Sequence, residues 1–263
     1  QGFVCRGGRM LNEETYENFW ELFRGIPSLE QPQRSVTEEI LNFDHAHPTC
    51  AHARLIDKDA KILDVRSMGF DNADRLAMTK LLLTPEERLD NMTIEDWFGP
   101  HFFETNFWYM WQTTFAFQKW SSLFEFRRYM NRMIFEFPRI ETLEGVTRTP
   151  YNQYESVILP LRAYLETNGV RFETGRTVTD IDFAPGEALT ATALHFADGS
   201  AVDLREGDVC IMTNACMTDS ATLGNLHAPA PAPERKPVSA ELWAKVAAKR
   251  PGLGNPEPFF GNV

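Results

Sequence analysis

The chain has 263 residues, a formal net charge of −11 and a hydrophobic content of 43%. This length allows one large domain or two small ones, and the composition is that of a globular protein able to bury a core. The acidic balance argues against nucleic-acid binding, because such proteins usually present a basic surface. No run of 18 apolar residues predicts a transmembrane helix, and the four cysteines, with no CxxC spacing, favour a reducing compartment.

Residues 1–11 read as a short strand that enters the loop Arg6-Gly7-Gly8-Arg9, with Met10 next. Adjacent glycines permit positive φ and close approach of the backbone, and the arginines supply planar cations suited to phosphates or carboxylates. The chain starts without an initiator Met and almost on top of this loop. We interpret it as a segment of a longer protein.

A first helix is expected from Asn12, a suitable N-cap, up to Pro27, because apolar residues recur at spacings of three and four. A second helix is expected between a capping pattern at Ser35 and Pro48. Residues 53–64 read as a hairpin around a polar turn.

A further helix is expected over residues 72–83. The stretch 93–137 is very rich in aromatic residues and almost free of glycine after Gly99. Apolar residues on all sides of a helix indicate burial on several sides. We therefore expect two or more buried helices here.

The second half of the chain has the character of an α/β protein. A buried strand of a parallel sheet reads as a short continuous apolar run, and an Asp-Gly turn between alternating segments indicates a hairpin. The expected elements are a helix that stops at Asn168-Gly169, two strands within 170–183, a hairpin over 191–204, a buried strand at 207–215, a Pro/Ala-rich linker and a short helix capped by Ser239.

Two classes of site are set aside. Three histidines, Asp44 and Cys50 fall within nine residues, but their spacing matches no standard zinc pattern, so a polar surface loop is the favoured interpretation and no metal site is predicted. No G-x-S-x-G elbow occurs, and the cysteines lack a base partner, which argues against nucleophilic catalysis.

Tyr129, within the aromatic stretch, is a candidate proton donor, although packing of a helix tyrosine explains it equally well from the residues alone. The segment YNQYES offers phenol, amide and carboxylate groups just before a helix, with helix capping as the alternative.

Five blocks in this order resemble the oleate hydratases, also called the myosin-cross-reactive antigen family. They are RGGRM, NFWYMWQTTFAFQKW, EFRRYMNRM, RTPYNQYESVILPL and MTNACMTDSATLG. The resemblance runs from Gly2 to about Asn262 and covers the middle of a typical member. It implies an α/β fold, part of a Rossmann-like, glutathione-reductase-type FAD domain with a large helical substrate-binding insertion.

The implied segments are an FAD-domain loop at 1–11, a helical substrate channel at 12–145, a return to the FAD domain at 146–226, and a linker with a short helix at 227–263. The family adds water across the cis-9 double bond of unsaturated fatty acids, with FAD as a cofactor that is not consumed. The expected activity is therefore that of a hydro-lyase, converting oleate to 10-hydroxystearate.

The resemblance also assigns residues. Tyr129 matches the proposed proton donor, and Gln153, with Tyr151 beside it, matches the block associated with the fatty acid. Met10 stands where the family has the glutamate thought to activate water, so Glu13 or Glu14 are the substitutes considered. The residues expected near FAD are Arg6, Gly7, Gly8, Arg9, Val178, Asn214 and Ala215.

Two alternatives stay open at this point: another FAD-dependent oxidoreductase or isomerase, and a non-catalytic protein that binds fatty acid or FAD, which Met10 favours. The expected ligand is an unsaturated fatty acid, with no nucleic-acid partner. Cytoplasmic location is expected, peripheral membrane contact is kept open, and the oligomeric state is either monomer or homodimer.

Overall fold

The computed structural model describes residues 10–89, 91–214, 220–232 and 237–256. The chain divides into two compact units, Gln1–Val170 and Arg171–Val263. The described residues form helices and one small antiparallel sheet, which is compatible with the expected α/β class. Among these residues no helix combines the length and apolarity needed to cross a membrane.

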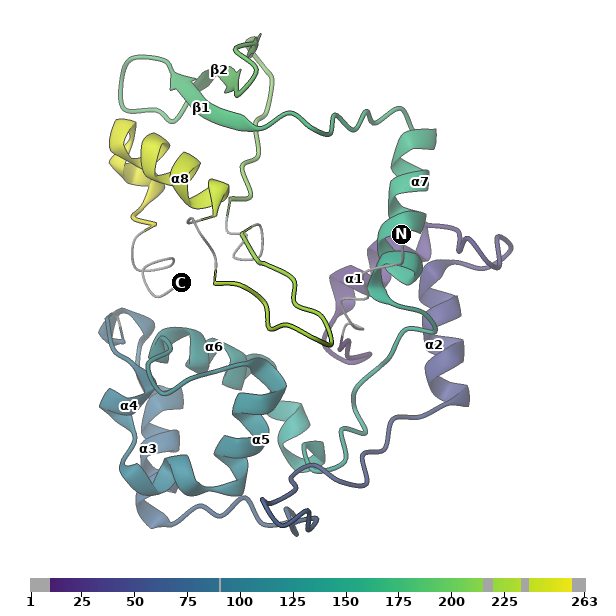
Figure 1. The fold of residues 1–263 in the computed structure, drawn as a ribbon, viewed down its shortest axis with the longest axis vertical. Helices are drawn as coiled ribbons and strands as arrows, with labels where there is room; N and C mark the ends of the chain where they lie inside the picture. Colours follow the sequence, from purple (N-terminus) through teal and green to yellow (C-terminus); the bar gives the residue numbers. More distant parts are fainter. Residues whose placement is uncertain (1–9, 90, 215–219, 233–236, 257–263) are drawn as a thin grey trace. The chain divides into compact units, whose positions relative to one another are not determined.

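The first unit contains a helical group built from both of its ends. Its elements are α1 (Glu17–Arg24), α2 (Val36–Ala46), the π-helix η4 (Tyr154–Ile158) and α7 (Leu159–Thr167). Figure 1 shows α1 and α2 beside α7. Trp20, Ile40 and Val157 meet in one core cluster, so residues more than 100 positions apart hold this group together.

The capping prediction at Ser35 is confirmed and the one at Asn12 is wrong. The Ser35 hydroxyl accepts a hydrogen bond from the Glu38 N–H, and the Glu38 carboxylate accepts one from the Ser35 N–H, a complete capping box. Helix α1 instead begins after Tyr16. The Asn12 side chain closes the preceding turn, where its Oδ1 accepts from the N–H of Glu14.

The aromatic stretch forms the second helical group of this unit, as expected. Its elements are α3 (Asn72–Leu83), η1 (Glu86–Arg88), α4 (Ile94–Trp97), η2 (Pro100–Glu104), α5 (Asn106–Phe115), α6 (Leu123–Arg132) and η3 (Ile134–Arg139). Phe102 is fully buried and stacks on Phe98 at 3.8 Å between ring centroids. Arg127 ties α6 to α3 by donating to the carbonyl oxygens of Leu81 and Leu82.

The expected hairpin over 53–64 shrinks to a single bridge between Ile56 and Ile62. The Asp57 carboxylate closes the turn by accepting from the N–H groups of Asp59 and Lys61. Both isoleucines are about 60% exposed, because no further strand packs on them among the described residues. A two-stranded ribbon without such support is marginal.

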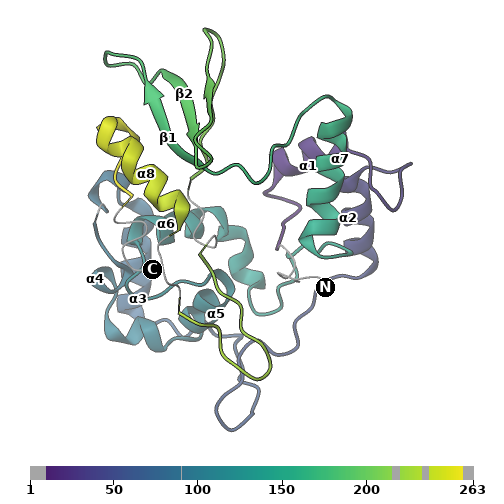
Figure 2. The same cartoon turned by 45° about the horizontal axis from the view of Figure 1, so that its top comes forward.

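The second unit holds the sheet β1 (Val178–Phe183), β2 (Ala191–Phe196) and β3 (Ala201–Asp203), antiparallel in chain order. Gly199 adopts φ 82° in the β2–β3 turn, which confirms the predicted hairpin. Figure 2 shows β1 above α8 (Val238–Lys249), which is followed by η5 (Pro251–Leu253). Ile181 packs with residues of α8 in a small core.

Three expectations for this region are wrong. Residues 170–174 form no strand, and neither do the described residues 207–214. Val209 and Ile211 are 84% and 83% exposed, because no neighbouring strand pairs with them among the described residues. Helix α8 has Pro237 at its N-cap and so begins before Ser239.

Candidate functional site

The first unit contains a half-open cavity of about 750 Å³, lined by residues of both helical groups. This volume lies within the range of about 300–1,000 Å³ that holds small-molecule ligands. Most of its wall is aromatic and aliphatic, with Phe19, Trp111, Phe115 and Val157 among the lining residues. The polar or ionisable side chains in the wall are Asn12, Tyr16, Thr114, Tyr129, Glu136 and Gln153.

Met10 reaches the cavity because the chain beside it is held in a bridge. The N–H of Leu11 donates to the carbonyl of Thr147 at 3.1 Å, and the N–H of Thr147 donates back at 2.9 Å. The Asn12 side chain then donates to the carbonyl of Gly145 at 3.0 Å. Residues 10–12 and 145–146 therefore form one continuous piece of the cavity wall.

Tyr129 lines the cavity from α6 and is 38% exposed. Its ring meets Phe115 and Phe117 edge to face, at centroid distances of 5.6 and 5.2 Å. Ala116, between these two phenylalanines, ends α5 in a left-handed conformation with φ 59°. Within the described residues the Tyr129 hydroxyl makes no hydrogen bond to protein, so the side chain is held by the packing of its ring on Phe115 and Phe117.

Gln153 lines the same cavity at the start of the π-helix, and Val157 lines it one turn later. Single π-turns occur often at functional sites, because they shift side chains out of regular helical register. Buried Ser156 fixes this turn by accepting a hydrogen bond from the N–H of Tyr151 at 3.1 Å. Tyr151 itself is 46% exposed and is not part of the cavity lining.

Glu136 is a cavity residue that the sequence analysis missed. Its Oε1 accepts from Asn12 Nδ2 and from Arg139 Nη2, both at 2.6 Å. Arg139 also pairs with Glu14 at 3.3 Å on its other side. Nothing in the local pattern of residues 134–139 marks Glu136, because its partner Asn12 is 124 positions away.

Arg54 makes a second set of contacts to the cavity wall that the sequence analysis missed. Arg54 donates to the Thr114 hydroxyl at 2.9 Å and to the Ile140 carbonyl at 3.0 Å. Burial lowers the pKa of Arg54 from its ordinary value. Its guanidinium therefore ties two cavity-lining residues together from behind the wall.

The proposed substitutes for the family glutamate do not line the cavity. Glu13 pairs with His45 at 3.0 Å, where both side chains are about half exposed or more, and Glu14 pairs with Arg139. In the His- and Cys-rich segment, the Asp44 carboxylate accepts from the N–H of Arg148. Those acidic groups therefore have partners on the protein surface.

The residues expected near FAD divide into two sets. Arg6, Gly7, Gly8, Arg9 and Ala215 lie outside the described residues. Val178 and Asn214 belong to the second unit, where Val178 pairs with Phe196 and Asn214 Nδ2 donates to the carbonyl of Ser239 at 3.0 Å. The structure brings together Met10, Tyr129 and Gln153 in one cavity of the first unit.

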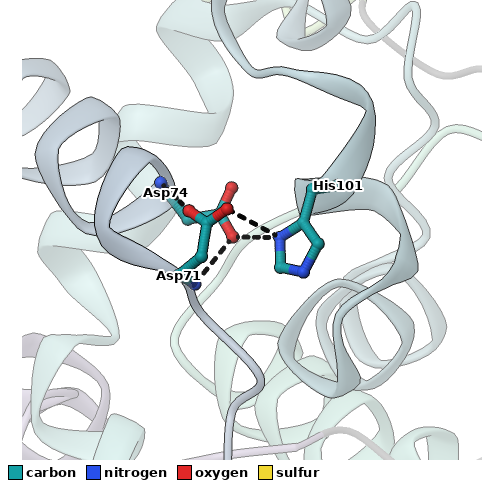
Figure 3. Close-up of side chains that lie close together, drawn as sticks. All are labelled: Asp71, Asp74 and His101. Carbon is teal, nitrogen blue, oxygen red and sulfur yellow. Dashed lines mark hydrogen bonds and ion pairs between the residues drawn. The ribbon is translucent and has the colours of Figure 1, made fainter.

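A separate cluster of ionisable groups lies at the start of α3, and Figure 3 shows it. His101 Nδ1 lies 2.7 Å from the buried Asp74 carboxylate and 3.5 Å from that of Asp71. The hydrogen bond to Asp74 raises the pKa of His101, although burial opposes it. Asp71 and Asp74 also form the capping box of α3, so this arrangement anchors a helix end.

The comparisons with known proteins agree with the resemblance drawn from the five sequence blocks. The chain is 43% identical over 274 residues to the linoleate hydratase of Lactiplantibacillus plantarum, across 99% of this chain and 48% of that protein. It is 34% identical over 267 residues to the oleate hydratase of Streptococcus pyogenes serotype M49 (strain NZ131), across 100% of this chain and 45% of that protein. The chain therefore spans about half the length of the curated relatives it matches.

A protein-family model described as the MCRA family matches residues 1–263. This match leaves no part of the chain outside the family pattern, and the resemblance inferred from sequence is confirmed. The chain belongs to the MCRA family.

Proposed function

We propose that this chain forms the substrate channel and part of the cofactor domain of a fatty-acid hydratase, a hydro-lyase that adds water to a cis double bond of an unsaturated C18 acid. The observation that carries the proposal is that the wall of one largely apolar cavity contains Met10, Tyr129 and Gln153. These residues come from three separate sequence blocks. The names of the two relatives supply the reaction class.

An isolated alkene is a very weak base, so hydration needs an acid placed against one carbon and water at the other. In this proposal the Tyr129 hydroxyl donates its proton to C9 as water adds to C10. Aromatic walls keep bulk water out and hold the double bond between the two groups. The Gln153 amide binds the acyl chain or its carboxylate, with Tyr151 at the edge of this segment.

We infer that FAD is the cofactor, bound by a Rossmann-like domain of the glutathione-reductase type to which residues 1–11 and 146–226 contribute. When bound, FAD would supply a flat polar surface without net electron transfer, because addition of water is redox-neutral. Of the residues expected near FAD, Val178 pairs with Phe196 in the sheet and Asn214 donates to the carbonyl of Ser239. The chemistry above is therefore assigned only to residues of the cavity wall.

The ligand proposed for this site is an unsaturated fatty acid. A cytoplasmic location is also proposed, and the exposed Cys50 and Cys210 are free thiols. A non-catalytic binding protein is the second candidate, because Met10 lines the cavity where a carboxylate was expected. A redox flavoenzyme is the third candidate and would bleach the flavin when it meets substrate.

Incubation of the intact FAD-loaded protein with oleate, and separately with linoleate, tests these alternatives. The proposed function predicts a product heavier than the substrate by one water, detected by mass spectrometry. Binding without any such product would support the non-catalytic candidate. Stoichiometric anaerobic bleaching of the flavin by the fatty acid would support the redox candidate.

A further inference from the structure

We propose that Glu136 is the carboxylate that orients and deprotonates the attacking water in this cavity. The inference rests on the hydratase function proposed above and names the base for that same site. Glu136 belongs to η3, a short helix that follows the Tyr129 helix, and its side chain is 14% exposed. Among the described residues that line the cavity, it is the only acidic one.

The hydrogen bonds of Glu136 are unequal between its two oxygens. Asn12 and Arg139 both donate to Oε1, each at 2.6 Å. No described residue donates a hydrogen bond to Oε2. This oxygen is also not one of the fully buried side-chain atoms that lack a hydrogen-bond partner. A carboxylate has about four acceptor sites, so Glu136 keeps capacity for a water molecule while one oxygen holds it in place.

The Asn12 amide that holds Glu136 has one defined orientation. Its Oδ1 accepts from the N–H of Glu14 and from the hydroxyl of Thr15, both at 3.0 Å. Two donors on Oδ1 leave Nδ2 to face the other way, toward Glu136 and the Gly145 carbonyl. Asn12 is only 4% exposed, so water does not compete strongly for these contacts.

Gly145 makes room for the carboxylate. A Cβ atom built at this position would overlap both carboxylate oxygens of Glu136. A side chain at this position would therefore force the Glu136 carboxylate to move away from the backbone of residue 145. The Glu136 carboxylate therefore occupies the space that a side chain at residue 145 would fill.

The position of Glu136 bears on the methionine at residue 10. A thioether is a weak hydrogen-bond acceptor and cannot take a proton from water at neutral pH. Met10 stands two residues before Asn12, whose amide contacts Glu136, and all three line the cavity. The cavity wall thus contains a carboxylate, although position 10 lacks the one that the family has there.

The step balances without any added oxidant or reductant. The O–H bond of Tyr129 breaks and its proton bonds to C9 of the alkene. The water oxygen bonds to C10, and the proton that this water loses goes to Glu136. Transfer of that proton back to the tyrosinate through solvent restores both groups.

Glu136→Gln in the intact FAD-loaded protein tests the inference, with Glu14→Gln as the matched control. Both substitutions remove a carboxylate from Arg139, but only Glu136 lines the cavity. We expect Glu136→Gln to lower kcat by about 100-fold or more, the usual contribution of a general base, with fatty-acid affinity nearly unchanged. Glu14→Gln should keep wild-type turnover, and added formate should restore part of the activity of Glu136→Ala.

Undiminished turnover by Glu136→Gln would overturn the inference, as would an equal loss in Glu14→Gln, which would assign the effect to the Arg139 ion pairs. If circular dichroism shows that Glu136→Gln does not fold, Glu136→Asp replaces it. This variant keeps the charge but shortens its reach, so lower kcat with unchanged affinity supports the role and unchanged kcat rejects it. A wild-type protein that forms no hydroxy acid would instead refute the proposed function, which separates the two failures.

Discussion

Replacement of Tyr129 by phenylalanine separates the chemistry of the hydroxyl from the packing of its ring. The hydroxyl makes no hydrogen bond to described residues, while the ring meets Phe115 and Phe117 at 5.6 and 5.2 Å. Phenylalanine preserves both edge-to-face contacts and leaves no void in the packing around the ring. The free energy of unfolding should therefore change by less than about 0.5 kcal/mol, the usual range for a substitution that disturbs no buried contact.

The effect on turnover should be far larger. A positioned general acid contributes about 10²–10⁴-fold, so loss of the Tyr129 proton should raise the activation free energy by about 3–5 kcal/mol. Hydroxy-acid formation from oleate and linoleate, followed by mass spectrometry, measures this loss. Fatty-acid binding, followed by calorimetry, should stay close to the wild-type value.

Tyr109→Phe is the matched control, because Tyr109 lies on the neighbouring helix α5 with a similar exposure of 42% and does not line the cavity. It should retain full turnover. Undiminished product formation by Tyr129→Phe would reject Tyr129 as the proton donor. Loss of fatty-acid binding together with turnover would show that the hydroxyl acts by positioning the substrate.

Three further outcomes are expected. Gly145→Ala should displace the Glu136 carboxylate and reduce kcat, and loss of its partly buried hydrogen bonds to Asn12 and Arg139 should lower the free energy of unfolding in urea titrations by about 1 kcal/mol. Met10→Glu should lower hydroxy-acid formation, because it places a second carboxylate beside the Glu136 site; a rise would show that water activation limits the wild type. The pKa of His101 is raised beside Asp74, so protonated His101 stabilises the fold. This stabilisation is complete below about pH 6.5 and disappears as the pH rises through the folded-state pKa. Urea midpoints should therefore fall across that range in the wild type and fall less in His101→Gln.

Local patterns predicted those parts of the fold that local interactions determine. The capping box at Ser35 and the turn around Gly199 depend on residues within three or four positions, and both form as expected. The strand expected at 207–215 depends on neighbouring strands to supply hydrogen-bond partners. Its apolar residues Val209 and Ile211 are exposed because such partners are absent among the described residues.

The candidate site shows the same division between local and long-range information. The sequence blocks named Met10, Tyr129 and Gln153, and one cavity wall contains all three. Tyr151 stands two residues from Gln153, yet it is not part of that wall. Tyr151 lies in the bend before the helix, whereas Gln153 is the N-cap residue of the π-turn, so the two side chains leave different local structures. The spacing of residues along the chain does not show that difference.

Position 10 and position 136 are best understood together. Two carboxylates that face one water repel each other, and repulsion between like charges favours protonation of one of them. In the proposed mechanism Asn12 and Arg139 hold Glu136, and an apolar side chain at position 10 avoids a second carboxylate in the same cavity wall. Met10 is then consistent with a working hydratase whose base comes from η3, and a loss of activity in Glu136→Gln but not in Glu14→Gln would separate this arrangement from a cavity that only binds fatty acid.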